Sequence, residues 1–349
     1  MSKIYAPVLI PTLNRVEHFQ RCLESLAKNH GAEHTDIYIS VDYPPSEKYV
    51  AGNKRIIEYL KTCRALERFR SATIFYQDHN LGSTGNTLYL QNRIKEKYEC
   101  YIFTEDDNEF SVWFLEYINC GLMAFKDHPY VISIHGFKDT DWIFDEGVPV
   151  TGAKLFAGYG YGAWYSAKEK WDRDIQRFLL DRKRLYPKNI AKLFASNRYL
   201  FAMYISSLIC SDSGLFWNSE NQLALVDTVK SIYMSFTDYY CIVPDKSKVR
   251  NWGNDGSGAN MLRNTDINPL TKWRIEEDKP VEYDPAEVKY ISENDKLAEK
   301  YLSQIIGIKA LCVSIIRYVL LLFLGLDRER YLRVKKRIRK IAHMCKRNK

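Results

Sequence analysis

The sequence predicts an α/β fold in which a mostly parallel sheet is flanked by helices and followed by a helical tail. Short apolar runs alternate with segments of helical periodicity, the first four runs end in polar or acidic residues, and residues 303–349 change from strongly apolar to strongly basic. Strands that alternate with helices form right-handed βαβ units, and the loops at the carboxyl ends of parallel strands gather at one edge of the sheet. A functional site is therefore expected at that edge.

Three early apolar runs, 6–10, 36–41 and 72–76, are expected as strands of this sheet, because a segment with helical spacing follows each. Polar residues lie just beyond them: Asn14, Asp42 and Asn80. The glycine-containing loop 81–86 matches neither the Walker pattern nor the dinucleotide fingerprint, which removes most support for a kinase or a dehydrogenase. A plain turn and a loop that approaches a pyrophosphate both remain open.

The fourth run, residues 101–104, leads directly into Glu105, Asp106 and Asp107. Like charges so close together repel each other, so this cluster needs a cation, a hydrogen-bonded ligand or open water. A divalent ion holding a phosphate would satisfy the three acids, and a solvated acidic turn is the plain alternative. Beyond them, the apolar spacing predicts a helix over 112–125 and a strand over 131–134.

Small residues alternate with large flat rings over residues 157–164. Three of the rings, Tyr159, Tyr161 and Trp164, are candidates for stacking on the apolar face of a sugar, as aromatic rings do on other flat ligands. Ordinary packing in an aromatic core explains the same pattern equally well, so both interpretations remain open.

The charge of the chain is concentrated at its end. The net charge is +8 over 349 residues, yet residues 327–349 hold eleven Lys or Arg against two acids, a net +9, which leaves −1 for the rest. A near-neutral globule with a cationic tail is therefore expected rather than a nucleic-acid reader with a basic folded face. The eight cysteines form no C-x-x-C pair, and the N-terminus lacks the layout of a signal peptide, so a cytoplasmic protein with reduced thiols is expected.

In the order and spacing of its motifs, the chain resembles the GT-A glycosyltransferases, particularly bacterial family 2-like enzymes of surface-polysaccharide synthesis, over roughly residues 4–265. The acid triplet is also similar to that of N-acetylglucosaminyltransferase I. The matching pieces are Pro-Thr-Leu-Asn-Arg at 11–15, Asp42, Asn80-x-Gly82, the triplet 105–107, the aromatic segment 159–164, and Pro244 followed by Asn-Trp-Gly-Asn-Asp-Gly-Ser-Gly at 251–258.

The resemblance implies a donor site for a nucleotide-sugar, with a UDP-sugar expected. Asp107 would ligate Mn²⁺ or Mg²⁺ bridging the donor's diphosphate, and Asp106 would reach the ribose. Thr12, Asn14 and Asp42 would bind the nucleoside. Hard carboxylate oxygens suit such ions, and the metal would neutralise charge on the departing nucleoside diphosphate.

Two departures from the family pattern affect this site. Thr-Gly-Asn at 84–86 replaces the Ala-Arg-Asn of many members, so a phosphate-binding arginine is missing unless Arg93 or Arg15 substitutes for it. Arg15 and Asn80 are both expected among the donor-binding residues. The histidine that often follows the Gly-Ser-Gly segment, sometimes as a metal ligand, is Asn260 here. Metal binding is then expected to use fewer protein ligands and more waters, or activity to be reduced.

An inverting enzyme of this kind needs a carboxylate that deprotonates the acceptor hydroxyl. Related sequences place this base in a Trp-Asp element about seventeen residues before the proline that corresponds to Pro244, which indicates Asp227. Val226 stands where the tryptophan is expected, and Glu220 is a competing candidate. A solvated helical acid is the plain alternative for Asp227.

The C-terminal tail, residues 303–349, is expected to associate with a membrane surface. Residues 304–326 are almost entirely apolar but contain Lys309 and Arg317, and two cations disfavour a full crossing. A helix lying in the membrane plane lets both cations reach the headgroups, and the following basic segment adds attraction to anionic lipid. A buried helix with a solvated basic end is the alternative.

The expected organisation is a transferase domain over 1–265, with a nucleotide half to about 110 and an acceptor half over 111–265, then an extension over 266–302 and the tail. The expected activity is transfer of a sugar to a glycan or a polyprenyl-diphosphate-linked acceptor at the cytoplasmic membrane face. Two rivals are a nucleotidyltransferase, disfavoured because no Gly-rich, Arg- and Lys-bearing loop follows the first strand, and a non-catalytic glycan-binding or scaffold protein with the same fold.

Overall fold

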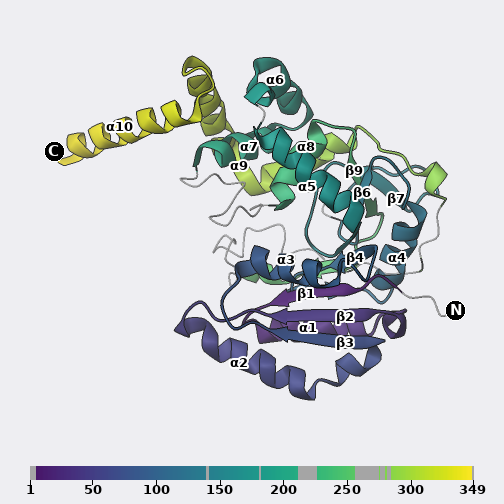
Figure 1. Cartoon of the computed structure of the whole chain (residues 1–349). Coiled ribbons are helices and arrows are strands. Elements are labelled where there is room, and N and C mark those ends of the chain that lie inside the picture. Colours follow the sequence, from purple (N-terminus) through teal and green to yellow (C-terminus); the bar gives the residue numbers. More distant parts are fainter. Residues whose placement is uncertain are drawn as a thin grey trace. The chain divides into compact units, whose positions relative to one another are not determined.

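The computed structural model describes residues 5–138, 141–180, 182–210, 226–255, 275, 280 and 284–347. Contacts divide the chain into two compact units, Met1–Arg173 with Asp238–Leu297 and Asp174–Thr237 with Ala298–Lys349 (Figure 1). The functional boundaries expected at 265 and 302 stay a prediction.

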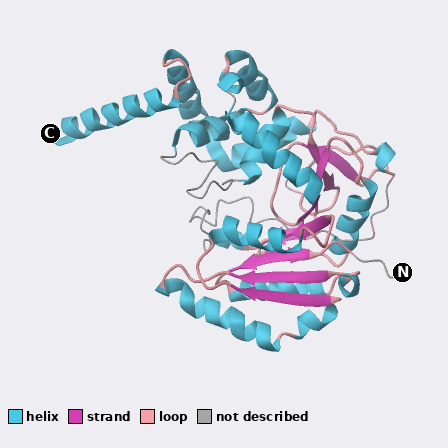
Figure 2. Cartoon of the chain, viewed as in Figure 1, coloured by secondary structure: helices cyan, strands magenta, loops and turns pink. Residues whose placement is uncertain are grey.

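The first unit contains an eight-stranded sheet that confirms the predicted α/β fold. Its strands in spatial order are β3 (Ser71–Tyr76), β2 (Asp36–Val41), β1 (Val8–Thr12), β4 (Cys100–Phe103), β8 (Tyr161–Trp164), β6 (Val131–His135), β9 (Tyr240–Pro244) and β7 (Val150–Ala153). Six strands run in one direction, and β8 and β7 run against them. The arrows for β1, β2 and β3 point the same way in Figure 2. The sheet is thus mostly parallel.

Helices flank this sheet, as the alternating pattern predicts. They are α1 (Val16–Ala27), α2 (Glu47–Thr62), α3 (Gly82–Ile94), α4 (Phe114–Ala124) and the start of α5 (Tyr165–Leu180). The apolar stripe of α1, with Phe19, Cys22, Leu23 and Leu26, is fully buried in the main core. Such a stripe at helical spacing is what anchors a short helix to a sheet. The crossovers therefore place the loops after β1, β2 and β4 at the same edge.

A small antiparallel ribbon stands beside the acids. β5 (Asn108–Phe110) pairs with β10 (Val249–Asn251), so Asn251 lies opposite Asn108. Two strands of three residues each are too short to be recognised from periodicity alone. Their pairing brings residues 249–255 to the loop that follows β4.

The second unit is helical. It contains α6 (Pro187–Ser196), α7 (Arg198–Cys210), α8 (Val226–Ser235), most of α9 (Asn294–Phe323) and α10 (Arg328–Arg347). Gly307 has a φ of 72° and interrupts α9 with a kink, so the apolar part is a separate helical segment from Ile308 onward. The predicted helical tail is thereby confirmed.

The apolar part of α9 has two different faces. One face is buried and carries Leu311, Ser314, Tyr318 and Leu321. The Tyr318 hydroxyl donates to the carbonyl of Leu185 at 2.7 Å, and Ser314 contacts Ser206 at 3.0 Å. The opposite face, here called the exposed face of α9, carries Ile308, Ile316, Val319 and Phe323, which are 62, 67, 44 and 82% exposed. Among the described residues, Ile306–Phe323 is long and apolar enough to cross a membrane by length and composition.

Candidate functional site

The candidate site lies in the first unit, beyond the carboxyl ends of β1, β2 and β4. Thr12 ends β1, and the backbone N–H of Asp42 donates to its carbonyl at 2.9 Å. The Thr12 hydroxyl donates to Oδ2 of Asp106 at 2.7 Å. The register of the parallel strands thus brings together three residues that the sequence placed at separate strand ends.

Asp106 and Asp107 are both 5% exposed and share one arginine. Nη2 of Arg15 lies 2.5 Å from Oδ1 of Asp106, and Nη1 lies 2.8 Å from Oδ2 of Asp107. The third acid, Glu105, is exposed. Burial raises the pKa of Asp107, and the adjacent Arg15 opposes that rise without cancelling it. The acid pair is therefore a buried anionic site whose charge Arg15 balances in part, and not a solvated turn.

The ribbon partner completes the surroundings of Asp107. Nδ2 of Asn251 donates to Oδ1 of Asp107 at 2.7 Å and to Oδ1 of Asn108 at 2.9 Å. The N–H of Trp252 donates to the carbonyl of Asp107 at 2.8 Å. At Gly253 an added Cβ would lie 2.1 Å from Oδ2 of Asp107. Every carboxylate oxygen of Asp106 and Asp107 accordingly has a donor.

Asp42 organises the neighbouring loop. Its Oδ1 accepts the N–H groups of Tyr43 at 2.9 Å and Leu81 at 2.8 Å, and its Oδ2 accepts Nδ2 of Asn80 at 3.1 Å. Burial raises the pKa of Asp42, against the lowering effect of these backbone donors. Asp42 and Asn80 are thus brought together, while Asn14 is half-buried in the loop between β1 and α1.

The three candidate aromatic residues differ in exposure. Tyr161 and Trp164 are 5 and 6% exposed, and the Tyr161 ring stacks on His135 with centroids 5.7 Å apart. They occupy the core, which is the packing alternative that the sequence left open. Tyr159 is half-buried and meets Phe137 edge-on at 5.0 Å.

Neither candidate base belongs to the first unit. Asp227 lies in the first turn of α8 in the second unit, is half-buried, and its carbonyl accepts the Ser231 hydroxyl at 2.8 Å. Glu220 and Asn260 lie outside the described residues. The catalytic roles of Asp227 and Glu220 stay predictions.

Sequence reasoning missed three contacts of the acid pair. It gave no role to Asn251 or Gly253, although both belong to the segment 251–258 that it singled out. It considered Arg15 as a phosphate ligand and did not predict the ion pairs of Arg15 with Asp106 and Asp107. His18 was also missed: its Nε2 lies 3.1 Å from Oδ2 of Asp255 and 3.3 Å from the carbonyl of Trp252. The ribbon of β5 and β10 explains these omissions, because it joins segments about 140 residues apart.

The oxygen donors of the acid pair fit a hard divalent cation in kind. Within the described ranges, no group of three or more His, Cys, Asp or Glu residues could hold a metal ion. The expectation of few protein ligands for such an ion stays a prediction.

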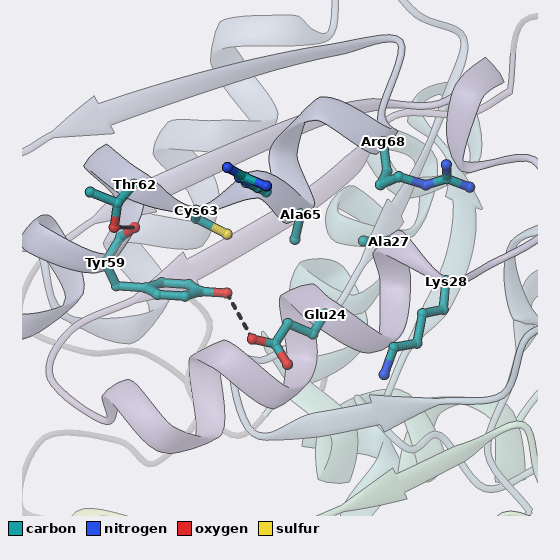
Figure 3. Close-up of a pocket in the computed structure, with 9 residues that line it drawn as sticks. Glu24, Ala27, Lys28, Tyr59, Thr62, Cys63, Ala65 and Arg68 are labelled. Atoms are coloured by element: carbon teal, nitrogen blue, oxygen red, sulfur yellow. Dashed lines mark hydrogen bonds between the residues drawn. The ribbon is translucent and has the colours of Figure 1, made fainter.

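A concave region, shown in Figure 3, lies where α1 and α2 end. It is lined by Lys28, Arg64 and Arg68, and at its other end the Tyr59 hydroxyl donates to Glu24 at 3.4 Å. The carboxyl ends of two helices carry partial negative charge, which these cations complement. The region lies at the helix ends and not beyond the carboxyl ends of the strands, so it is separate from the acid pair.

Comparisons with known proteins give only weak similarity. No protein-family model matches the sequence, and no curated protein matches it significantly. Three glycosyltransferase structures resemble it. S. aureus TarS is 14% identical over 49% of this chain and 30% of TarS, with a TM-score of 0.33. The Pyrobaculum calidifontis mannosyltransferase PcManGT, in complex with GDP-Man and Mn²⁺, is 12% identical over 49% of this chain and 47% of its own, and mouse xyloside xylosyltransferase 1 is 9% identical over 55% of this chain and 76% of its own, each with a TM-score of 0.32. The match spans less than half of the first two proteins. At these scores the function has to be argued from the site itself.

Proposed function

We propose that the protein is an inverting glycosyltransferase that moves a sugar from a nucleotide-sugar, a UDP-sugar, to a glycan or a polyprenyl-diphosphate-linked acceptor at the cytoplasmic face of a membrane. One observation carries the proposal: two buried carboxylates, Asp106 and Asp107, meet Thr12 and Arg15 beyond the carboxyl ends of parallel strands. Open α/β sheets bind nucleotides at this edge.

The donor's nucleoside is assigned to the loops after β1 and β2. Asp42 would accept a hydrogen bond from the base, with Thr12, Asn14 and Asn80 around it. Asp106 would accept from the ribose hydroxyls. The burial of Asp42 and its three hydrogen bonds support this role, because a fixed acceptor discriminates between bases better than a mobile one.

The divalent ion is assigned to Asp107, with Mn²⁺ or Mg²⁺ as candidates. When bound, such an ion stabilises the negative charge that builds on the departing diphosphate. Asp107 supplies a carboxylate whose other oxygen is fixed by Asn251. Its burial also keeps water from competing for the charges.

The acceptor side rests on fewer residues. Tyr159, half-buried, is the aromatic residue that we retain for sugar stacking. Asp227 is assigned as the base that takes the proton of the acceptor hydroxyl, with Glu220 as the competing assignment.

The exposed face of α9 and the basic helix α10 are assigned to the membrane. An apolar face of a helix next to a strongly basic segment is the pattern of a helix that lies in an anionic membrane surface. The opposite face of α9 is buried against other residues of the second unit, such as Leu185. A helix with one covered face fits a position in the membrane plane better than a full crossing. The expected location is therefore peripheral.

Calorimetry with UDP, with and without Mn²⁺, tests the proposal. We expect binding that strengthens with Mn²⁺ and is lost in Asp107→Asn, whereas Glu105→Gln, a change at the exposed acid, keeps it. Donor hydrolysis across a panel of nucleotide-sugars then identifies the sugar. Wild-type turnover that Asp107→Ala leaves unchanged would rule out the metal role, and no UDP binding under either condition would favour the scaffold protein.

A further inference from the structure

Arg15 occupies a specific position relative to the acid pair. Its guanidinium bridges Asp106 and Asp107 with separate nitrogen atoms, and its side chain is 22% exposed. The bond to Asp107 uses Oδ2, while Oδ1 of the same carboxylate is held by Asn251. One of the two positive charges that the ionised acids require is thus already present without any ion.

Other basic side chains that the structure describes nearby have partners of their own. The Arg21 and Arg250 guanidinium carbons lie 4.2 and 3.5 Å from the ring centre of Trp252, and His18 faces Asp255. Trp252 in turn donates from its ring nitrogen to Glu109 at 2.8 Å. Of the basic side chains that the structure describes, Arg15 is the one with ion pairs to Asp106 and Asp107.

A divalent ion at Asp107 and the guanidinium of Arg15 repel each other at short range, and both require the same carboxylate charge. Binding of one therefore weakens binding of the other. Arg15 also precedes α1 directly, at its N-cap position, and a helix N-terminus favours negative groups. A guanidinium is well suited to phosphate oxygens because it offers a planar fork of donors.

We propose that Arg15 is the internal counter-cation of the donor-free site, that it competes with the divalent ion for Asp107, and that it passes to the donor's diphosphate when the ion binds. The proposal rests on the proposed function for its last step. It makes Arg15 a positioning residue that keeps the acid pair charged and folded until nucleotide and ion arrive together.

The first test measures Mn²⁺ binding in the absence of nucleotide, by calorimetry or by the electron paramagnetic resonance signal of free Mn²⁺. Arg15→Gln removes the competing charge, so we expect Mn²⁺ to bind about tenfold more tightly, within the roughly 5- to 150-fold range of coupled ligands. Arg15→Lys keeps the charge but loses the fork, and its Mn²⁺ affinity should lie between the two.

The matched control is Arg55→Gln. Arg55 pairs with Glu17 at 2.6 Å, and both side chains are more than 60% exposed, so the change removes the same charge and an ion pair of the surface type. We expect its Mn²⁺ affinity to equal that of the wild type. Thermal unfolding of each variant shows whether it is folded. If Arg15→Gln is not folded, the Mn²⁺ affinity of Arg15→Lys alone decides whether Arg15 competes with the ion.

The second test measures UDP affinity at saturating Mn²⁺, where Arg15→Gln should weaken UDP binding about tenfold because the diphosphate loses its guanidinium. Mn²⁺ affinity that is equal or lower in both Arg15 variants would overturn the competition. UDP affinity that is unchanged would overturn the transfer to the diphosphate. Failure of the wild type to bind any nucleotide would instead overturn the proposed function, so the two failures are distinguishable.

Discussion

Nη1 of Arg15 lies 2.8 Å from Oδ2 of Asp107, so a buried ion pair joins the loop after β1 to the loop after β4. This pair opposes the effect of burial, which raises the pKa of Asp107 above its ordinary value of 3.8. If Asp107 ligates the divalent ion as proposed, its protonation state links metal binding, stability and pH at one carboxyl group.

The first prediction concerns pH. An acid whose pKa is raised in the folded protein favours folding when protonated and opposes it when ionised, so its stabilising contribution is lost as pH rises through that pKa. Arg15→Gln removes a group that lowers the pKa of Asp107, so the pKa should rise further. We expect the variant's loss of unfolding free energy, relative to the wild type, to be small in acid and to grow as pH rises.

Urea unfolding at a series of pH values measures this difference. In the control, Arg55→Gln, the difference in unfolding free energy from the wild type should not change with pH. Mn²⁺ affinity should rise with pH, because only the ionised carboxylate of Asp107 is expected to bind the cation. Its half-maximal pH should be higher in Arg15→Gln than in the wild type. A stability difference that is constant with pH would contradict the linkage to Asp107.

The strands that build this edge could be predicted from sequence because each is a continuous apolar run. Residues 36–41 form β2 as expected, and every one of its residues is buried, which is typical of a central parallel strand. The acid pair could also be placed, because it follows such a run directly. Local periodicity was sufficient in both cases.

The contacts across the site could not be predicted in the same way. Asn251 meets Asp107 through a ribbon of two three-residue strands, and Arg15 meets the acids across about 90 residues of chain. Neither contact leaves a periodic signal. Tyr161 and Trp164 show the related problem, because a ring that packs in a core and a ring that stacks on a sugar have the same neighbours in sequence.

The second prediction concerns Gly253→Ala. The new Cβ would lie 2.1 Å from Oδ2 of Asp107 and 3.3 Å from Nη1 of Arg15, so the carboxylate has to turn away from its donors. A buried charge that loses a hydrogen bond costs roughly 1–3 kcal/mol. We expect UDP and Mn²⁺ affinity to fall at least tenfold, measured by calorimetry on the folded protein.

A glycine in the core provides the contrast. At Gly136 an added Cβ would lie 2.5 Å from the Phe114 ring, so Gly136→Ala should lower the unfolding free energy. It should leave ligand affinity of the folded protein intact. Equal ligand affinity in Gly253→Ala and the wild type would show that the close approach at Gly253 is not needed for the site.

The third prediction concerns the membrane. Ile316 and Phe323 on the exposed face of α9 would each contribute roughly 1.5–3 kcal/mol on burial in lipid. Ile316→Glu combined with Phe323→Glu should therefore reduce binding to vesicles of anionic phospholipid by tenfold or more. Met123→Glu, a change at a 60% exposed residue of α4, is the matched control and should bind like the wild type.

Cosedimentation with vesicles measures both variants. Binding of the wild type should also weaken as salt is raised or as the anionic lipid is replaced by a zwitterionic one, because the basic helix α10 acts through charge. A double variant that sediments as fully as the wild type would show that another surface holds the membrane.

The fourth prediction separates a transferase from a scaffold that binds nucleotide. If Asp227 takes the proton of the acceptor hydroxyl, Asp227→Asn should lower the transfer rate about 10²- to 10⁴-fold, because that is the typical contribution of general base catalysis. UDP affinity should stay at the wild-type value, since the base acts on the acceptor. Asp238→Asn, at an exposed residue, removes the same charge and should keep full activity.

The Glu220→Gln variant completes the comparison between the two candidate bases. Loss of transfer in Glu220→Gln with normal transfer in Asp227→Asn would move the role to Glu220. The wild type could also bind UDP with Mn²⁺ and yet neither hydrolyse nor transfer any sugar from the donor panel. That result would exclude both residues as catalytic bases and would leave the acid pair as a nucleotide-binding site without catalysis. We expect ligand binding to depend on Arg15, Asp106 and Asp107 and turnover to require the base as well, so the pair of measurements assigns each failure to one part of the protein.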